Sequence, residues 1–366
     1  MATALRIMQG RDAALPPVFH AHSFRRSPLF QRLLASALTL TALAAAPAHA
    51  QQAPQALLNT SYDIARELFA AINPKFQADW KAKTGQDVSI EQSFAGTSRQ
   101  AQSIIQGLKA DVVTFNQVPD VDILAQNKLL AADWQKKFAN NSSPYYSTIA
   151  FLVRRGNPKN IKTWDDLVRD DVKLVFPNPK TSGNARYSYL GAWLYAHEKF
   201  KGDDAQTRAF VGKLLKNVES FPTGGRGATV AFAQNNQGDA LLTFESEVNN
   251  IAQGDEFKAQ GFEVVVPPVS VLAEFPVAVV DKVADEKGTR KVAEAYLQFQ
   301  YSPAIQKLLT DFNYRVHDAE AVKASASRFP AIRLINPQDV LGSWDQITKT
   351  HFAANGVLDQ LLGAGR

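Results

Sequence analysis

The amino-acid sequence predicts an α/β fold built of two lobes. After residue 50, short runs of β-branched and aromatic residues alternate with longer helical patterns, which is the order of elements found in α/β domains. The chain has 366 residues, a length that favours two hydrophobic cores over one. Breaks containing Gly or Pro at 155–158 and 266–268 are positions at which the chain can cross between lobes. Two lobes joined in this way leave a cleft in which a small ligand can bind.

The predicted elements follow one another along the chain. Clusters of apolar and β-branched residues predict strands at 57–61, 88–93, 112–115, 148–153, 173–176, 241–244, 264–266 and 277–280. Helices are predicted at about 64–83 and 98–106, and Gly107 ends the second because glycine readily takes the left-handed C-terminal position. The last third of the chain is predicted to be mainly helical.

The first fifty residues have the three parts of a secretory signal. Arg25, Arg26 and Arg32 precede an apolar run at 33–46, and a small-x-small site follows at 48–50. We expect cleavage after Ala50 and export of residues 51–366 to the periplasm. A retained membrane anchor is the weaker alternative, because fourteen helical residues rise only about 21 Å across a hydrocarbon core of about 30 Å.

Composition and charge exclude several classes of function. The chain has no cysteine, which excludes disulfide frameworks, cysteine zinc sites, iron–sulfur clusters and a cysteine nucleophile. Residues 1–50 hold five Arg and one Asp, and so account for +4 of the formal net charge of +5. Residues 51–366 carry 35 basic and 34 acidic side chains, so we expect no nucleic-acid partner.

Four strand-to-helix junctions share small and hydroxyl residues. They lie at 59–63, 93–98, 181–184 and 223–227. Small residues let a ligand approach the backbone, and a helix start offers unpaired N–H donors whose dipole attracts an anion. The hydroxyls of Thr97 and Ser182 can donate further hydrogen bonds. The alternative for any single junction is that these are ordinary capping residues.

Several longer segments carry a family resemblance. The runs LLNTSYDIARELFAAINP (57–74), GLKADVVTFNQV (107–118), FPNPKTSGNARY (176–187), TGGRGAT (223–229), LTFESEVNNI (242–251) and GSWDQITKTHF (342–352) resemble the periplasmic thiosulfate/sulfate-binding proteins of ABC importers. The resemblance implies a type 2 periplasmic-binding-protein-like fold, with residues 51–147 and 269–366 in one lobe and 148–268 in the other. It also implies a monomeric receptor that captures thiosulfate, and sulfate as well, and passes it to membrane permease subunits of an ABC importer.

The resemblance further implies a site of uncharged hydrogen-bond donors. The matching positions are the backbone N–H groups of Asp63, Thr97, Gly183, Asn184 and Gly225, the Ser182 hydroxyl, and Phe244. In the sulfate-specific relatives an indole N–H stands at the position of Phe244, whereas the thiosulfate-type relatives resemble this chain. Thr97 replaces a common Ser and Phe94 a common His, which puts the contacts of that segment in doubt.

Elementary chemistry favours an obligate dianion for such a site. Sulfate and thiosulfate carry no proton near neutral pH, so donors alone satisfy them. Phosphate keeps a proton and favours an acceptor, a role open to Asp63, although Asp63 is more readily explained as a helix cap. Molybdate, phosphate or ferric ion on the same fold remains the alternative ligand.

Four arginines follow the junctions closely: Arg66, Arg99, Arg186 and Arg226. We expect them to pair with acids or carbonyls around the rim, with direct clamping of the anion as the alternative. Tyr145 and Tyr146 resemble the paired tyrosines of ferric-ion receptors, but packing is favoured because histidines are few and widely spaced.

Catalysis finds little support in the sequence. Glu245 and Glu247 lie two apart, but a turn or helix start after Phe244 favours their exposure to solvent over acid–base chemistry. A secreted ester hydrolase is the least favoured function, because the chain has no G-x-S-x-G motif and no credible Ser-His-Asp set. We therefore expect no enzymatic activity, no cofactor and no metal.

Overall fold

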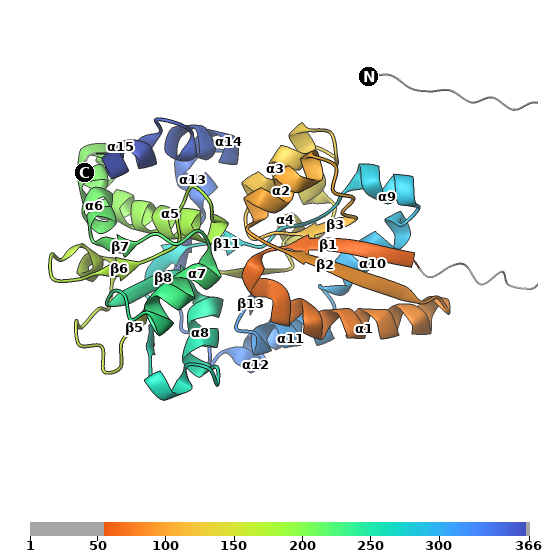
Figure 1. The fold of residues 1–366 in the computed structure, drawn as a ribbon, viewed down its shortest axis with the longest axis horizontal. Helices are drawn as coiled ribbons and strands as arrows, with labels where there is room; N and C mark the ends of the chain where they lie inside the picture. Colours follow the sequence, from red (N-terminus) through yellow and green to blue (C-terminus); the bar gives the residue numbers. More distant parts are fainter. Residues whose placement is uncertain (1–54, 364–366) are drawn as a thin grey trace, which may run out of the picture. The chain divides into compact units, whose positions relative to one another are not determined.

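A computed structural model describes residues 55–363, and Figure 1 shows the arrangement of their helices and strands. The predicted signal segment 1–50 and its cleavage site at Ala50 lie outside the described residues.

The first sheet has four strands in the order β12-β3-β1-β2. Its strands are β1 (Gln55–Ser61), β2 (Val88–Phe94), β3 (Val112–Thr114) and β12 (Val277–Val279). β1 runs parallel to β2 and β3, and β12 is antiparallel to β3. The connecting helices are α1 (Arg66–Thr84), preceded by the 3₁₀ turn η1 (Asp63–Ala65), and α2 (Thr97–Ile105). The parallel strands bring their carboxyl ends, and the helix starts that follow, to one edge of the sheet.

The second sheet has five strands in the order β7-β6-β8-β5-β9. Its strands are β5 (Ile149–Val153), β6 (Leu174–Val175), β7 (Val218–Ser220), β8 (Ala240–Phe244) and β9 (Glu263–Val265). β6 is parallel to β7 and β8, while β5 is antiparallel to β8 and β9. All residues of β5 and β8 are buried, which agrees with their continuous apolar runs. The predicted strands therefore all form, with ends shifted by one or two residues.

Several helices follow the strands of the five-stranded sheet, and two of them begin at predicted junctions. They are α5 (Gly183–Lys199), α6 (Asp204–Lys216), α7 (Gly225–Thr229), the π-helix η4 (Val230–Gln234) and α8 (Glu245–Gln253), with the 3₁₀ turns η3 (Trp164–Val168) and η5 (Lys258–Gln260). α5 and α7 start where the glycine-containing runs at 181–184 and 223–227 were predicted to open helices.

Two neighbouring segments, at 147–149 and 271–273, carry the chain between the sheets, and the chain crosses a third time between residues 316 and 333. The two neighbouring segments join β4 (Tyr145–Ser147) to β5, and β10 (Val269–Val271) to β11 (Ala273–Glu274), and we call them the crossover segments. β11 pairs with β4, and the Thr148 hydroxyl donates to the Val271 carbonyl at 2.7 Å.

The crossing points expected at the Gly and Pro breaks are therefore wrong. The break at 155–158 joins β5 to η3, and Phe151 contacts Trp164 on the same side of the crossing, with ring centroids 5.0 Å apart. After the break at 266–268 the chain is still beside β5, because the Ser270 hydroxyl donates to the Ile149 carbonyl.

The remaining elements complete the described chain. They are α3 (Val118–Gln126), η2 (Trp134–Lys136), α4 (Ala139–Ser142), α9 (Asp281–Lys287), α10 (Arg290–Phe299), α11 (Pro303–Asp311), β13 (Arg315–Val316), α12 (Ala319–Ser325), β14 (Arg333–Ile335), α13 (Pro337–Leu341), α14 (Trp344–Ile347), the π-helix η6 (Thr348–Phe352) and α15 (Val357–Gly363). The predicted helical C-terminal third is thus confirmed.

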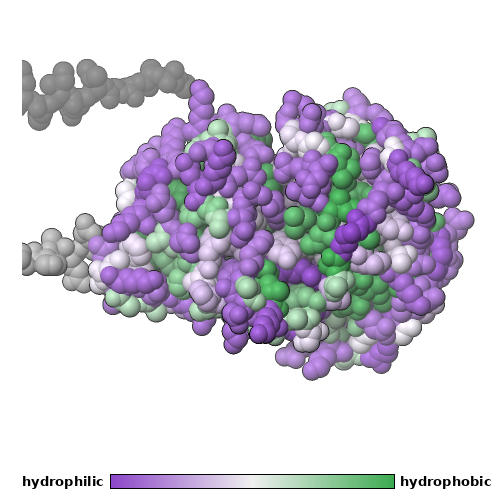
Figure 2. Space-filling view, turned by 180° about the vertical axis from the view of Figure 1, so that it is seen from behind, coloured by the Kyte–Doolittle hydropathy of each residue, from purple (hydrophilic) through white to green (hydrophobic). Residues whose placement is uncertain are grey.

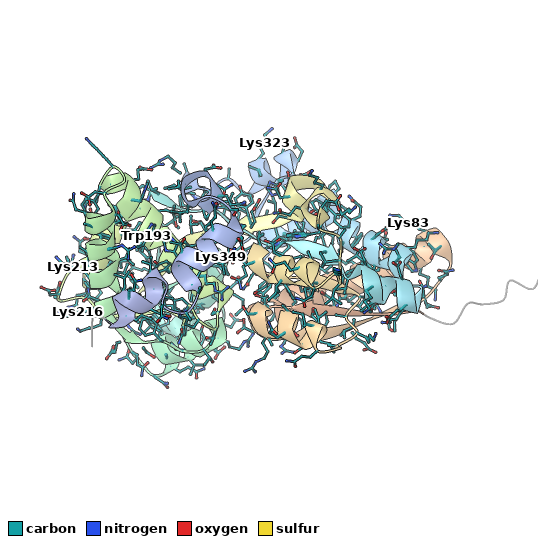
Figure 3. All side chains as sticks on the ribbon, turned by 90° about the horizontal axis from the view of Figure 1, so that it is seen from above. Lys83, Trp193, Lys213, Lys216, Lys323 and Lys349 are labelled. Atoms are coloured by element: carbon teal, nitrogen blue, oxygen red, sulfur yellow. The ribbon has the colours of Figure 1, made fainter. Side chains whose placement is uncertain are left out.

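The C-terminal helices pack beside α5 and α6, next to the five-stranded sheet. His351 of η6 contacts Trp193 of α5, with ring centroids 4.7 Å apart, and accepts or donates a hydrogen bond at 2.9 Å to Tyr189. In Figure 3 Trp193 and Lys349 lie in the same half of the view as Lys213 of α6. Burial lowers the pKa of His351 to about 4, so this histidine is neutral at pH 7.

Among residues 55–363, no helix is both long enough and apolar enough to cross a membrane. Figure 2 shows one face of the molecule, on which hydrophilic residues dominate. Apolar residues gather on the half that holds the five-stranded sheet, on the right of this view.

Candidate ligand-binding site

A cleft of about 680 Å³ is lined by residues of all four predicted junctions, with Asp63, the first residue of η1, representing the junction at 59–63. From the four-stranded sheet it is lined by Asp63, residues 94–99, Gln102 and Asn116, and from the five-stranded sheet by residues 180–183 and 223–224. Asp63, Thr97, Ser182 and Gly183, all predicted from the sequence, therefore lie together.

Unpaired hydrogen-bond donors are the main chemical feature of this cleft. Within residues 55–363, the backbone N–H groups of the lining residues Thr97 and Gly183 have no hydrogen-bond acceptor, and neither has the hydroxyl hydrogen of Ser182. The backbone N–H groups of Asn184 and Gly225 are also without an acceptor; these two residues are not lining residues, but each directly follows a lining glycine. Each N–H stands in the first turn of its helix, where no intrahelical acceptor exists. Unpaired buried donors cost about 1–3 kcal/mol each, so the arrangement favours an acceptor-rich anion.

The two sides of the cleft approach closely at Gly183. A Cβ built on Gly183 would lie 2.6 Å from Asn116 Oδ1 and 2.8 Å from Gln117 Cδ, a separation that real side chains do not adopt. A larger residue at this helix start would have to displace the Asn116 and Gln117 side chains, so the restriction here comes from space rather than from backbone angle.

The Thr97 hydroxyl is not available to a ligand, contrary to the expectation from sequence. It lies 2.5 Å from Asp120 Oδ2 and 2.9 Å from Asn116 Oδ1, and Asp120 also accepts a hydrogen bond from the Ser98 hydroxyl at 2.9 Å. Gln117 donates to the same carboxylate. Sequence reasoning missed Asp120 and its partners, because their grouping depends on the contact between α2 and α3. Asp120 thus stabilises the start of α2, and the backbone N–H of Thr97 stays without an acceptor there.

The Asp63 carboxylate lies at the edge of the cleft, where it accepts a hydrogen bond from the Ile64 N–H at 3.1 Å. The predicted capping of its own helix is wrong, because Asp63 is the first residue of η1 and neither η1 nor α1 has a side-chain cap hydrogen bond. Burial raises the pKa of Asp63, and the backbone N–H groups of Arg226, Ile64 and Asp63 itself act in the opposite direction. Asp63 Oδ2 would be 3.0 Å from a Cβ on Gly224, so the carboxylate reaches the start of α7.

Two of the four arginines pair with an acid or a carbonyl, as expected: Arg226 with Glu67 at 3.2 Å, and Arg186 with the Pro179 carbonyl at 3.2 Å. Arg66 instead stacks over Phe94, a residue that lines the cleft, at 4.6 Å. Arg99 lines the cleft, and its guanidinium has no ion-pair or hydrogen-bond partner within the described chain.

Phe244 is not among the residues that line this cleft. It ends β8, is fully buried and packs against Phe275 and Tyr187, with ring centroids 5.0 and 6.0 Å away. The role of Phe244 in selectivity therefore stays a prediction.

The exposure expected for Glu245 is wrong, although α8 does begin directly after Phe244. Glu245 is fully buried and forms a two-pronged ion pair with Arg315 of β13, at 2.6 and 2.9 Å. Glu247, next to it on α8, accepts from the Thr229 hydroxyl at 3.2 Å, and burial together with the charge of Asp63 raises its pKa to about 7. Local sequence patterns do not indicate this ion pair, because Arg315 is seventy positions away from Glu245.

Tyr145 packs in the core, as expected. Its hydroxyl is 3.2 Å from that of Tyr62, which donates to Tyr314 at 2.9 Å. Burial raises the pKa of Tyr145 and Tyr62, so both stay protonated. Residues 55–363 contain no group of three or more His, Cys, Asp or Glu side chains placed to hold a metal ion.

The two sheets, the paired crossover segments and the donor-lined cleft define a two-lobed solute-binding protein. A family model of bacterial extracellular solute-binding proteins matches residues 62–315. The chain belongs to this family, and within it to the branch of the periplasmic thiosulfate/sulfate-binding proteins. The fold class and the family predicted from the sequence are confirmed.

Individual relatives are similar over most of their length. The chain is 57% identical over 312 residues to a thiosulfate-binding protein of Escherichia coli K12, covering 85% of this chain and 92% of that protein. It is 45% identical over 305 residues to a sulfate-binding protein of the same organism, covering 83% and 92%. The solved structure of the sulfate-binding protein SubI from Mycobacterium tuberculosis H37Rv matches with a TM-score of 0.72 at 29% identity, over 81% of this chain and 99% of that one.

Proposed function

We propose that this protein is a periplasmic receptor that binds thiosulfate, and also sulfate, and delivers it to the membrane subunits of an ABC importer. The observation that carries the proposal is the set of unpaired N–H donors and the Ser182 hydroxyl in one cleft. A dianion without protons accepts hydrogen bonds from all of them, and the dipoles of α2 and α5 add attraction. The names of the similar proteins support this choice of ligand.

We propose the seven predicted residues as the site, with Asp63, Thr97, Ser182, Gly183, Asn184 and Gly225 around the ion and Phe244 behind them. The first lobe is proposed at 51–147 and 269–366 and the second at 148–268, with two modifications. Residues 269–271 lie before the crossing at 271–273 and beside β5, which supports placing them with the second lobe. The pairing of β14 with β10 and the contacts of α13 and α15 with α5 and α6 support placing residues 333–363 there as well. Closure of the two lobes over the ion gives the form that the permease recognises.

Phosphate is the second candidate ligand, because the Asp63 carboxylate reaches the cleft and offers an acceptor to an oxyanion that carries a proton. The donors outnumber this single acceptor, which itself receives the Ile64 N–H. We therefore favour the unprotonated dianion. We propose a monomer that acts by binding alone, with neither catalysis nor a cofactor.

Thermal unfolding tests the proposal. A ligand that binds only the folded protein stabilises it by about 2.7 kcal/mol at a hundredfold excess over Kd. Residues 51–366 should melt at a higher temperature with thiosulfate or sulfate, and at an unchanged temperature with nitrate or chloride at matched ionic strength. Equal shifts with every anion would show general screening and would overturn the proposal, and a larger shift with phosphate would transfer it to that ion.

A further inference from the structure

The side chain of Asn184 has a buried amide group that the protein satisfies only in part. Asn184 is the second residue of α5 and is 2% exposed. Its Nδ2 lies 2.6 Å from the Thr243 hydroxyl oxygen, and its Oδ1 is buried with no hydrogen-bond partner in the described part of the chain. Such an acceptor costs about 1–3 kcal/mol if it stays unpaired.

The short contact to Thr243 indicates the other orientation of this amide. A distance of 2.6 Å is usual for a hydroxyl that donates to a carbonyl oxygen and is short for an N–H donor. A half turn of the amide exchanges its oxygen and nitrogen without moving another atom. The Thr243 hydroxyl then donates to Oδ1, and the NH₂ group takes the position of the unpaired oxygen.

The Asn184 amide lies beside unpaired donors at the start of α7. Its atom next to Thr243, Nδ2, is 3.8 Å from the point where a Cβ on Gly225 would stand, and the backbone N–H groups of Gly225 and of Asn184 itself are both without an acceptor. On the strand side, Phe244 follows Thr243 and has no polar atom to offer. An acceptor at this point would satisfy the NH₂ group together with both backbone N–H groups.

We infer that the Asn184 side-chain amide, held by the Thr243 hydroxyl, donates a hydrogen bond to the bound oxyanion. The inference rests on the proposed function and adds a side-chain donor to the Ser182 hydroxyl. It assigns Asn184 two contacts with the ion, one from the backbone and one from the side chain.

Calorimetric titration of an Asn184→Ala variant with sodium thiosulfate and sodium sulfate tests the inference. Loss of one donor to a charged acceptor should weaken binding of both ions about tenfold to a hundredfold. The matched control is Asn217→Ala, which removes a buried amide that bonds the Leu167 and Arg169 carbonyls away from the cleft. This control should lower stability and leave the affinity within about twofold of wild type.

Nuclear magnetic resonance of the wild-type protein gives a second readout that does not depend on the variant folding well. The side-chain amide of Asn184 should move in chemical shift and exchange its hydrogens more slowly when thiosulfate is added. Wild-type binding with an unchanged Asn184→Ala affinity, or with unmoved amide signals, would overturn this inference alone. A wild-type protein that binds neither ion would overturn the proposed function, and the inference with it.

Discussion

Several backbone donors of the cleft lack hydrogen-bond acceptors within the described chain, whereas charged groups beside the crossover segments are paired with each other. In the cleft and directly beside it, the N–H groups of Thr97, Gly183 and Gly225 have no acceptor among the described residues. Beside the crossover segments, Glu245 and Arg315 hold each other with two short hydrogen bonds. The donors of the cleft are satisfied only when an acceptor is added, whereas the charges beside the crossover segments are satisfied within the protein itself.

This difference predicts which property each region controls. Removing a group beside the crossover segments leaves its buried partner uncompensated, which lowers the free energy of unfolding. Removing a donor from the cleft deprives only the ligand, so the affinity falls while the stability of the empty protein changes little.

The largest expected effect is on stability, from Glu245→Gln. Loss of this charge leaves Arg315 buried without a counter-ion and should lower the free energy of unfolding by about 3–5 kcal/mol, as measured by urea denaturation. The matched control is Glu198→Gln, whose ion pair with Arg333 is about half exposed and should matter little. Equal losses in the two variants would remove the contrast between paired and unpaired regions.

Ser182→Ala should give the next largest effect, on affinity. In the proposed site this hydroxyl donates to a charged acceptor, so its loss should weaken thiosulfate binding by about 1.5–3 kcal/mol, or about tenfold to a hundredfold. The melting temperature of the ligand-free protein should stay close to that of wild type. Wild-type affinity in this variant would take Ser182 out of the site.

Glu247 should make stability depend on pH. Because its pKa is raised to about 7 in the folded protein, the folded state keeps a proton that the unfolded state releases near its ordinary value of 4.5. The stabilisation is complete below about pH 4.5 and is lost as the pH rises through about 7. Urea denaturation between pH 5 and 8 should show this fall in wild type and a flatter profile in Glu247→Gln. Parallel profiles would show that Glu247 titrates normally.

The smallest expected effect comes from Phe244→Trp. An indole N–H aimed at the ion would add a donor suited to oxygen more than to sulfur, tightening sulfate binding by about 0.5–1.5 kcal/mol. Thiosulfate should gain less, or lose affinity, because the larger ring crowds Phe275 and Tyr187. Competition titrations measure the ratio of the two affinities. An unchanged ratio would leave Phe244 as a packing residue.

The strands of the fold could be predicted from the sequence, but the positions at which the chain crosses between the sheets could not. Strands such as 241–244 form where apolar runs placed them, because burial on both faces leaves a continuous apolar signal. The crossover segments lie inside extended runs without Gly or Pro, at 147–149 and 271–273, and so give no local signal. The Gly and Pro breaks mark turns within one part of the molecule instead.

The site could be predicted as far as its backbone donors. Helix starts are local features, so small and hydroxyl residues revealed the junctions at Thr97 and Ser182. The side-chain partners depend on contacts between distant elements. Asp120 holds the Thr97 hydroxyl, and Arg315 pairs with Glu245, because the fold brings separate helices and strands together. No spacing in the sequence indicates such pairs.

Calorimetric titration of residues 51–366 with thiosulfate tests the central claim most directly, with sulfate, phosphate, molybdate and nitrate as competitors. The account predicts one thiosulfate bound per chain, displaced by sulfate and unaffected by nitrate, with phosphate a weak competitor. Absence of binding by both thiosulfate and sulfate, or equal competition from nitrate, would contradict the claim that the unpaired donors of this cleft hold an unprotonated dianion.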